Sequence, residues 1–232
     1  MKIDNVKASI EADKKYKTGK IREQNYQIIL DAAELLFAQH GFKGASMMAI
    51  AEEAGLPKAN VHYYFKNKST LYAAVLERII HQWNNGLEVI DEHDDPAEVL
   101  SAYIYDKTRL ACEKPMPSKL FAREIISGAP YLSDYIKTDM REWLQSKVAV
   151  FEQWMQAGKM RTVDAENLIF MIWATTQHYA DFETQVLTIR NRAEYTTDDI
   201  EHIADFVTDM LLAGCGLTKP AVKKPIQIKE AC

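Results

Sequence analysis

A segment whose residue types suit nucleic-acid binding lies between Gly55 and Tyr72, with the sequence GLPKANVHYYFKNKSTLY. Lysine and histidine alternate there with tyrosine and phenylalanine. An ammonium group attracts phosphate, an asparagine amide can pair with adenine through two hydrogen bonds, and a phenol can hold a phosphate in position. This combination predicts a surface that contacts both the backbone and the base edges of DNA.

The charge of the chain is distributed unevenly, which favours the same interpretation. The 232 residues carry 28 Lys and Arg against 33 Asp and Glu, a formal net charge of −5. Residues 1–70 nevertheless hold 11 basic and 8 acidic side chains, so the acidic excess lies in the remainder. A positive first part on an acidic body indicates that only one end of the protein meets a polyanion.

Two segments precede this region. Residues 1–22 alternate lysine with acidic and small residues without an apolar period, which predicts a flexible arm. Residues 23–39 carry apolar side chains at three- and four-residue spacing and predict an amphipathic helix that stops at Gly41. The apolar residues of that helix are Ile28, Leu30, Ala32, Leu35, Leu36 and Phe37.

Two short helices joined by a turn are predicted next. Ser46 is expected to cap a helix over 47–54, without the acidic residue of a full capping box. Gly55 ends that helix, and Pro57 occupies the first position of a second helix that reaches about Phe65. This spacing is that of a helix-turn-helix, in which the second helix enters the major groove of DNA.

The run ILDAAELLFAQHGFKGASMMAIAEEAGLPKANVHYYFKNKSTLYAAVL resembles the TetR family of transcriptional repressors. The resemblance is carried by Ala32-Ala33, Leu36-Phe37, Gly41-Phe42, Ile50-Ala51, Ala54-Gly55, Tyr64-Phe65, Lys68 and Leu71. It implies a helix-turn-helix domain followed by a larger helical domain for ligand binding and dimerisation. It also implies a homodimer on double-stranded DNA, because paired recognition helices read the two half-sites of an inverted repeat.

The residues of the helix-turn-helix divide by role. Val61 and Phe65 are expected in the core. The residues expected to contact DNA are Ser46 and Met47 at the backbone, Lys58, Asn60 and His62 in the groove, and Tyr63, Tyr64 and Lys68 at phosphates. His62 stands where the family usually has Tyr or Leu.

The rest of the chain also reads as helix, beginning with a helix capped by Ser69. Breaks rich in proline, glycine and polar residues separate further apolar-periodic segments, and no sustained two-residue alternation occurs. The fold class is therefore all-α, with about nine helices. The expected parts are the arm at 1–22, a helix-turn-helix domain at 23–68, an effector-binding and dimerisation domain at 69–216, and a C-terminal tail at 217–232.

One face of the helix predicted around 167–182 suits a small planar ligand. Trp173, Thr176 and Gln177 place an aromatic plate beside a hydroxyl and an amide, and Trp83 is a second candidate plate. The alternative is that both tryptophans belong to the core. LIFMIWATTQHYADF and LFAREIISGAPYL resemble the pyrimidine-responsive repressors of the family, which implies uracil or thymine bound by Trp83, Trp173 and Gln177. Arg123 departs from an expected apolar residue and could admit an acidic or larger ligand.

The opposite face of the same helix is predicted to meet a second subunit. It carries Met171, Ala174, Thr175, His178 and Phe182. A helix over 198–214 is expected to complete a four-helix dimer interface through Ile203, Phe206, Val207, Met210 and Leu211.

Other functions have little support in the residues. His178, Asp181 and Glu124 are available acids and bases, but no nucleophile motif or phosphate loop accompanies them, so we predict no enzyme, no metal and no cofactor. No apolar run reaches the roughly 20 residues of a membrane span, and no secretory signal is evident, which predicts a cytoplasmic protein. The alternative function is a ligand-independent DNA-binding activator or architectural protein.

Overall fold

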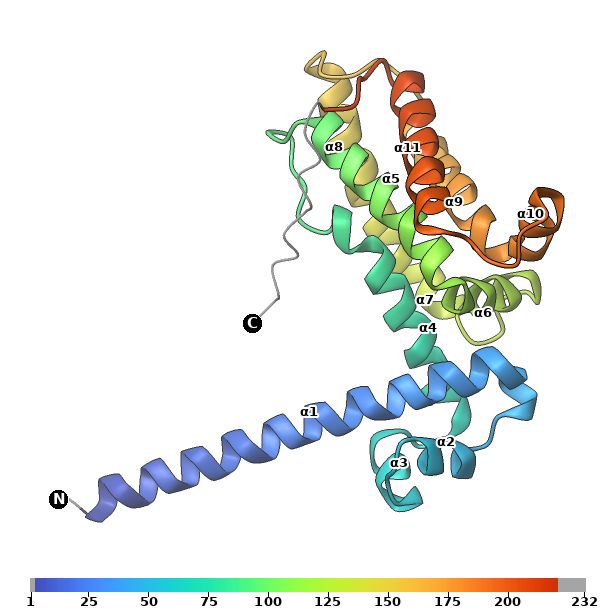
Figure 1. Cartoon of the computed structure of the whole chain (residues 1–232). Coiled ribbons are helices and arrows are strands. Elements are labelled where there is room, and N and C mark those ends of the chain that lie inside the picture. The colour runs from blue at the N-terminus through green and yellow to red at the C-terminus, as the bar shows by residue number, and fades with distance from the viewer. Residues whose placement is uncertain (1–2, 221–232) are drawn as a thin grey trace. The chain divides into compact units, whose positions relative to one another are not determined.

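The structure is a computed structural model that describes residues 3–220, with side chains from Lys20 onward. Its regular elements are helices, and no strand occurs within that range, which confirms the all-α class. A 3₁₀ turn (Asn85–Leu87) and a π-helical turn (Ile136–Met140) join longer elements. The helices (Figure 1) are α1 Ile3–Gly44, α2 Met47–Glu53, α3 Lys58–Tyr64, α4 Lys68–Asn84, α5 Pro96–Glu113, α6 Pro115–Ile126, α7 Ser133–Tyr135, α8 Arg141–Gln156, α9 Ala165–Asp181, α10 Glu183–Arg190 and α11 Thr197–Gly214.

The chain forms two compact units, Met1–Val75 and Leu76–Cys232, which divide within α4. This division lies later than the boundary before Ser69 that the sequence predicted. The first turns of α4 belong to the first unit because Tyr72 packs its ring edge-on against Phe37, at 4.9 Å between centroids, and against Phe42, at 5.1 Å.

Helix α1 differs from the prediction at both ends. Residues 3–22, expected as a flexible arm, form its first part, and they contain no proline to interrupt it. The helix does not end at Gly41 as expected but is kinked there, because that residue has φ +69°. Ile28 and Leu35 are exposed rather than buried. The face that packs inward is formed by Ile29, Leu30, Ala32, Ala33, Phe37 and Ala38.

Helix α4 is capped by Asn67, so the predicted cap at Ser69 is wrong. The Asn67 carboxamide oxygen accepts a hydrogen bond from the backbone N–H of Thr70 at 2.9 Å. The Thr70 hydroxyl oxygen in turn accepts from the Asn67 N–H at 3.3 Å. This reciprocal pair satisfies two backbone donors at the start of the helix.

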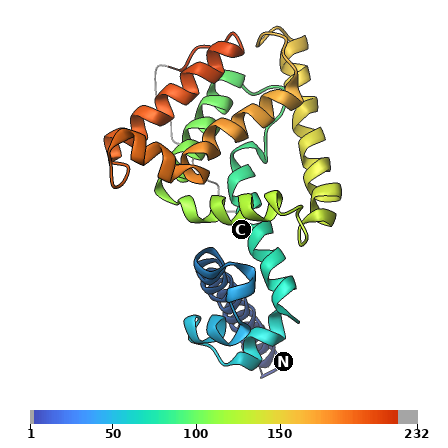
Figure 2. The same ribbon diagram turned by 90° about the vertical axis from the view of Figure 1, so that its right-hand side faces the viewer.

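The second unit is built around α5, which packs against both α11 and α9. Its core includes the fully buried, stacked rings of Phe151 and Trp154 on α8. In the view of Figure 2, α8 and α11 lie on opposite sides of this unit. Of the predicted tail, residues 217–220 have no regular structure and Lys219 pairs with Asp205 on α11, while residues 221–232 lie outside the described range.

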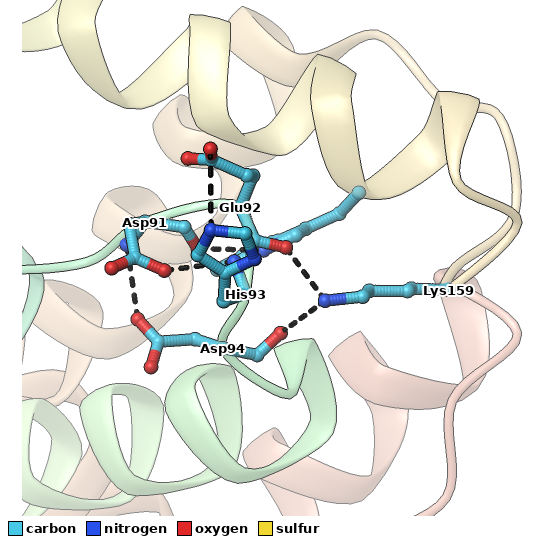
Figure 3. A network of polar contacts seen from close by, with 6 residues as sticks. Asp91, Glu92, His93, Asp94 and Lys159 are labelled. Carbon is cyan, nitrogen blue, oxygen red and sulfur yellow. Dashed lines mark hydrogen bonds and ion pairs between the residues drawn. The ribbon is translucent and has the colours of Figure 1, made fainter.

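A loop before α5 is held against the end of α8 by hydrogen bonds from side chains to its backbone carbonyl groups (Figure 3). The Lys159 ammonium donates to the carbonyl oxygens of Glu92 at 2.6 Å and Asp94 at 3.0 Å. The Trp154 indole donates to the carbonyl oxygen of Asp91 at 3.0 Å. An open surface hollow lies beside Glu92, His93 and Lys159. Since Lys159 is already bonded to the loop, we assign no ligand to this hollow.

Candidate DNA interface and effector site

The two short helices of the first unit are set by their end residues. The Ser46 hydroxyl oxygen accepts from the Ala49 N–H at 3.1 Å, which confirms the simple cap of α2. Gly55, at φ +64°, turns the chain out of α2 in a conformation that a side chain would strain. Pro57 is the residue before α3 rather than its first helical residue, with ψ 140°, and its carbonyl accepts from the Asn60 N–H at 2.8 Å.

Helix α3 has one buried and one exposed side. Val61 is fully buried, and Phe65, just after the helix, is nearly so. The outward side carries the residues that the sequence assigned to DNA: Lys58, His62 and Tyr63 are exposed, and Asn60 and Tyr64 are half-buried. These positions are compatible with groove binding, and the individual contacts remain predictions.

Helix α1 supports α3 through residues that sequence reasoning missed. Tyr26 stacks on Phe65 at 5.2 Å between ring centroids and lies 6.2 Å from the ring of Tyr64. The Arg22 guanidinium lies 5.9 Å from the ring centre of Tyr63, which is 71% exposed. The spacing of four residues between Arg22 and Tyr26, on one helix face, was the signal that could have suggested this pair.

Lys68 has a structural role that the sequence did not predict. Its ammonium donates to the carbonyl oxygen of Ala45 at 2.9 Å and lies 4.5 Å from the ring centre of Phe42. It therefore joins the first turn of α4 to the segment between α1 and α2. Ser46 is exposed and Met47 is half-buried at the start of α2, beside this contact.

A buried lysine is the main polar feature of the second unit. Lys107 on α5 is only 6% exposed, and its ammonium lies 4.6 Å from the ring centre of Trp83 on α4. It makes no hydrogen bond or close ion pair with any described residue. Burial lowers the pKa of Lys107 to about 7, while the charge of Asp181 opposes this shift.

Asp181, whose charge acts on Lys107, is itself hydrogen-bonded to Ser118. The buried Ser118 hydroxyl on α6 donates to the Asp181 carboxylate at the end of α9, at 2.6 Å. Burial raises the pKa of Asp181, and the Ser118 hydrogen bond and the charge of Lys107 counteract this rise. Beside this hydrogen bond in the sequence, an ion pair at 2.6 Å between Lys119 and Glu183 joins α6 to α10, the helix that follows α9.

The two tryptophan plates are both in contact with other side chains. Trp83 meets Phe121 edge-on, at 5.3 Å. The Trp173 indole donates to the Tyr103 hydroxyl at 3.1 Å, and its ring stacks on Trp143 at 6.1 Å. Both tryptophans thus lie among other aromatic side chains, in the unit where the sequence predicted a ligand. The Lys107 ammonium lies over the Trp83 ring, however, which limits the stacking of a ligand on that ring.

The remaining predicted ligand residues divide into one that fits and two that do not. Gln177 is half-buried on α9, one turn before Asp181, and makes no hydrogen bond among the described residues. Thr176 is fully buried and its hydroxyl donates back to the carbonyl oxygen of Ile172 at 2.8 Å, so it is not available to a ligand. Arg123 is exposed on α6, and the buried position beside it belongs to Glu124, which accepts from the Tyr131 N–H at 2.6 Å.

An apolar surface covers parts of α9 and α11. On α9, Met171 is 55% exposed, and the exposed His178 stacks on Phe182 at 5.1 Å. Ala174 is exposed beside them, and Thr175 is half-buried with its hydroxyl bonded to the Met171 carbonyl. On α11, Phe206 and Met210 are 56% and 62% exposed. The expectation for this helix was too broad, because Ile203, Val207 and Leu211 are buried in the core of their own chain.

The polar residues weighed for catalysis are used in other ways. Glu124 caps a backbone donor, Asp181 accepts from Ser118, and His178 lies on the apolar surface. No cluster of three or more His, Cys, Asp or Glu side chains with metal-binding geometry occurs among the residues that the structure describes. Within the same residues, no helix is long and apolar enough to span a membrane.

Both units match models of known protein families. Residues 29–75 match the family of bacterial regulatory proteins called tetR. Residues 76–218 match the C-terminal region of YcdC-like proteins. The chain is also 42% identical over 158 residues to the HTH-type transcriptional regulator RutR of Escherichia coli K12, a match that covers 68% of this chain and 74% of that protein.

Solved structures share the fold at low sequence identity. One is the transcriptional regulator FadR from Bacillus subtilis in complex with stearoyl-CoA, with a TM-score of 0.61 at 20% identity, covering 82% of this chain and 98% of that one. Another is AibR in complex with isovaleryl coenzyme A and operator DNA, with a TM-score of 0.57 at 20% identity, covering 80% and 97%.

Proposed function

This chain belongs to the TetR family of ligand-responsive transcriptional regulators, and from this premise we propose that it is a repressor. It binds an inverted-repeat operator as a homodimer in the cytoplasm and leaves the DNA when a small planar metabolite binds its second unit. Uracil and thymine are the first candidates for that metabolite.

DNA binding is supported by the outward side of α3. Lys58, Asn60 and His62 project from a helix whose other side is fixed by Val61. A recognition helix held in this way can present base-reading groups without rearrangement. Tyr63 is accessible to a phosphate, because its ring is exposed, and the Arg22 guanidinium lies beside it.

Ligand binding is supported by one observation above the others: Lys107 is 6% exposed as a residue, and its ammonium has no acceptor among the described side chains and carbonyl groups. A buried charge of this kind is costly unless something pairs with it. A carbonyl oxygen of a bound ligand would supply the acceptor, and the Asp181 carboxylate could accept an N–H of the same ligand. Uracil and thymine carry adjacent C=O and N–H groups, so Lys107 and Asp181 suit them. The amide of Gln177 could bond to another C=O or N–H group of the same ring.

Dimerisation is supported by the apolar surface of α9 and α11. Exposed Met171, Phe206 and Met210 on neighbouring helices are unusual for a monomer. A second copy bringing the same surface would bury them in a symmetric interface.

The response to ligand would use α4, which is continuous from Lys68 to Asn84. Trp83 lies near one end of this helix, and Lys68 binds Ala45 at the other. A ligand that binds Lys107, which lies over Trp83 of this helix, would favour one position of α4 over another. The affinity for DNA would then change in proportion to the difference between the ligand's affinities for the two positions.

The test has two stages. Sequencing of genomic fragments bound by the purified protein gives the operator, and a gel-shift titration with uracil, thymine and stearoyl-CoA then measures release. Loss of operator binding with a pyrimidine alone supports the proposal. Binding that no small molecule alters would favour the architectural alternative, and failure to select any DNA sequence would contradict repression.

A further inference from the structure

The positive charge of the first unit lies entirely at its beginning. Residues 1–22 hold seven Lys and Arg against three Asp and Glu, whereas residues 23–70 hold four against five. The match to the tetR family begins only at residue 29. The basic segment therefore lies upstream of the residues that match the family, and residues 23–70 have no excess of positive charge.

The structure places the end of this segment beside α3. Arg22 lies over Tyr63, and Tyr26, one turn later, packs against Phe65. Helix α1 is thus anchored to the C-terminal end of α3 at the point where the basic segment ends. Figure 1 shows α1 continuing beyond these contacts, away from the short helices.

The length of the segment sets its reach. Residues 3–22 lie in α1, and at about 1.5 Å per residue they span roughly 28 Å. Duplex DNA presents one phosphate charge for about every 1.7 Å of its axis, so a cationic rod of this length can approach several phosphates. The cations are mainly lysines, which act as point charges and suit phosphate better than base edges.

We propose that residues 3–22 form a second DNA contact that binds backbone phosphates outside the stretch of groove read by α3. This inference rests on the proposed DNA binding and adds a sequence-independent component to it. The segment would raise the affinity for all DNA and make that affinity more sensitive to salt, while leaving the choice of sequence to α3.

The test compares two triple variants with the same change in net charge. One replaces Lys14, Lys15 and Lys17 with Gln, which keeps a similar helix propensity. The matched control replaces Lys223, Lys224 and Lys229 with Gln. Fluorescence anisotropy measures the binding of each full-length variant to one labelled 40-base-pair duplex of scrambled sequence, from 50 to 200 mM KCl. Circular dichroism checks that helix content is unchanged.

The two proposals fail in different ways. We expect the slope of log K against log[KCl] to become shallower by about 0.9 for each phosphate that Lys14, Lys15 and Lys17 neutralise, with the control triple equal to wild type. Equal slopes for wild type and both triples would overturn this inference alone. An equal reduction in both triples would overturn it as well, because net charge would then be the cause. A wild-type protein that binds no duplex would instead contradict the proposed DNA binding.

Discussion

The ammonium nitrogen of Lys107 lies 4.6 Å from the centre of the Trp83 ring, buried in the second unit with no hydrogen-bond acceptor among the described residues. A cation over an indole gains some stabilisation from the ring, but less than a hydrogen-bonded ion pair would give in the same place. A ligand that supplies an acceptor would therefore add a hydrogen bond that no described residue provides.

The first prediction concerns Lys107 and stability. Lys107→Met should raise the unfolding free energy of the ligand-free protein at pH 7 by about 1–3 kcal/mol, because it removes a buried, poorly paired charge. The same variant should lose binding of uracil or thymine in calorimetric titration. Lys137→Met, at an exposed position, is the control for both measurements. A destabilised Lys107→Met protein would show that the ammonium is satisfied without a ligand.

A second prediction follows from the pKa of Lys107. Its folded-state pKa of about 7 lies below the unfolded value near 10.5, so the unfolded chain binds the extra proton between these values. The cost to stability is complete below about pH 7 and declines as the pH rises, by about 1.4 kcal/mol per unit. Urea unfolding at pH 7 and pH 9 should show a smaller gain with pH in Lys107→Met than in wild type. Identical pH profiles would indicate an unperturbed lysine.

The cap of α4 gives a third prediction. Asn67→Ala should lower the unfolding free energy of the protein by about 1 kcal/mol, because the Thr70 N–H loses its acceptor. Ser69→Ala, two residues later, should change it by a few tenths at most. Chemical denaturation followed by circular dichroism compares the two, and a larger effect at Ser69 would restore the cap that the sequence suggested.

A fourth prediction separates the two lysines at the start of α4. Lys68→Met should destabilise the protein by about 1–2 kcal/mol, because the Ala45 carbonyl loses a charged donor and Phe42 loses its cation. Lys66→Met, at an exposed position, should leave stability unchanged. Thermal unfolding measures both. If Lys68→Met weakens DNA binding without any loss of stability, phosphate binding is its whole role.

Sequence choice gives a fifth prediction. Asn60→Ala should reduce discrimination between the operator and its single-base variants at one position, by about 1–3 kcal/mol. Tyr63→Phe should weaken binding to every sequence by a similar factor, since a phosphate contact carries no sequence information. Competition gel shifts with a panel of operator variants measure both effects. Equal effects from the two substitutions would contradict this division of roles.

Periodicity predicted the fold class and the two faces of α9, because a side chain's direction on a helix follows from its position alone. Ile169 and Ala180 are buried and Met171 and Phe182 are exposed as that rule requires. Turn chemistry likewise located Ser46 and Gly55, since each acts on its nearest neighbours along the chain.

Contacts between distant residues could not be read from the sequence. Lys107 and Trp83 are 24 positions apart on different helices, and nothing in their local patterns indicates that they meet. The contact of Lys68 could not be foreseen, because its acceptor is the backbone carbonyl of Ala45, a group that every residue carries. The sequence therefore left Lys68 assigned to phosphate. The cap of α4 was placed two residues late because Asn67 and Ser69 are both good capping residues.

The Lys107 and Trp83 pair also has a practical consequence for building biosensors from this protein. A chain with methionine at position 107 would begin with more stability and with no preference for a carbonyl-bearing ligand. The added stability would let a library of variants tolerate destabilising changes at Gln177 and Asp181. Selection could then move the ligand response toward other metabolites while α3 still recognised the same operator.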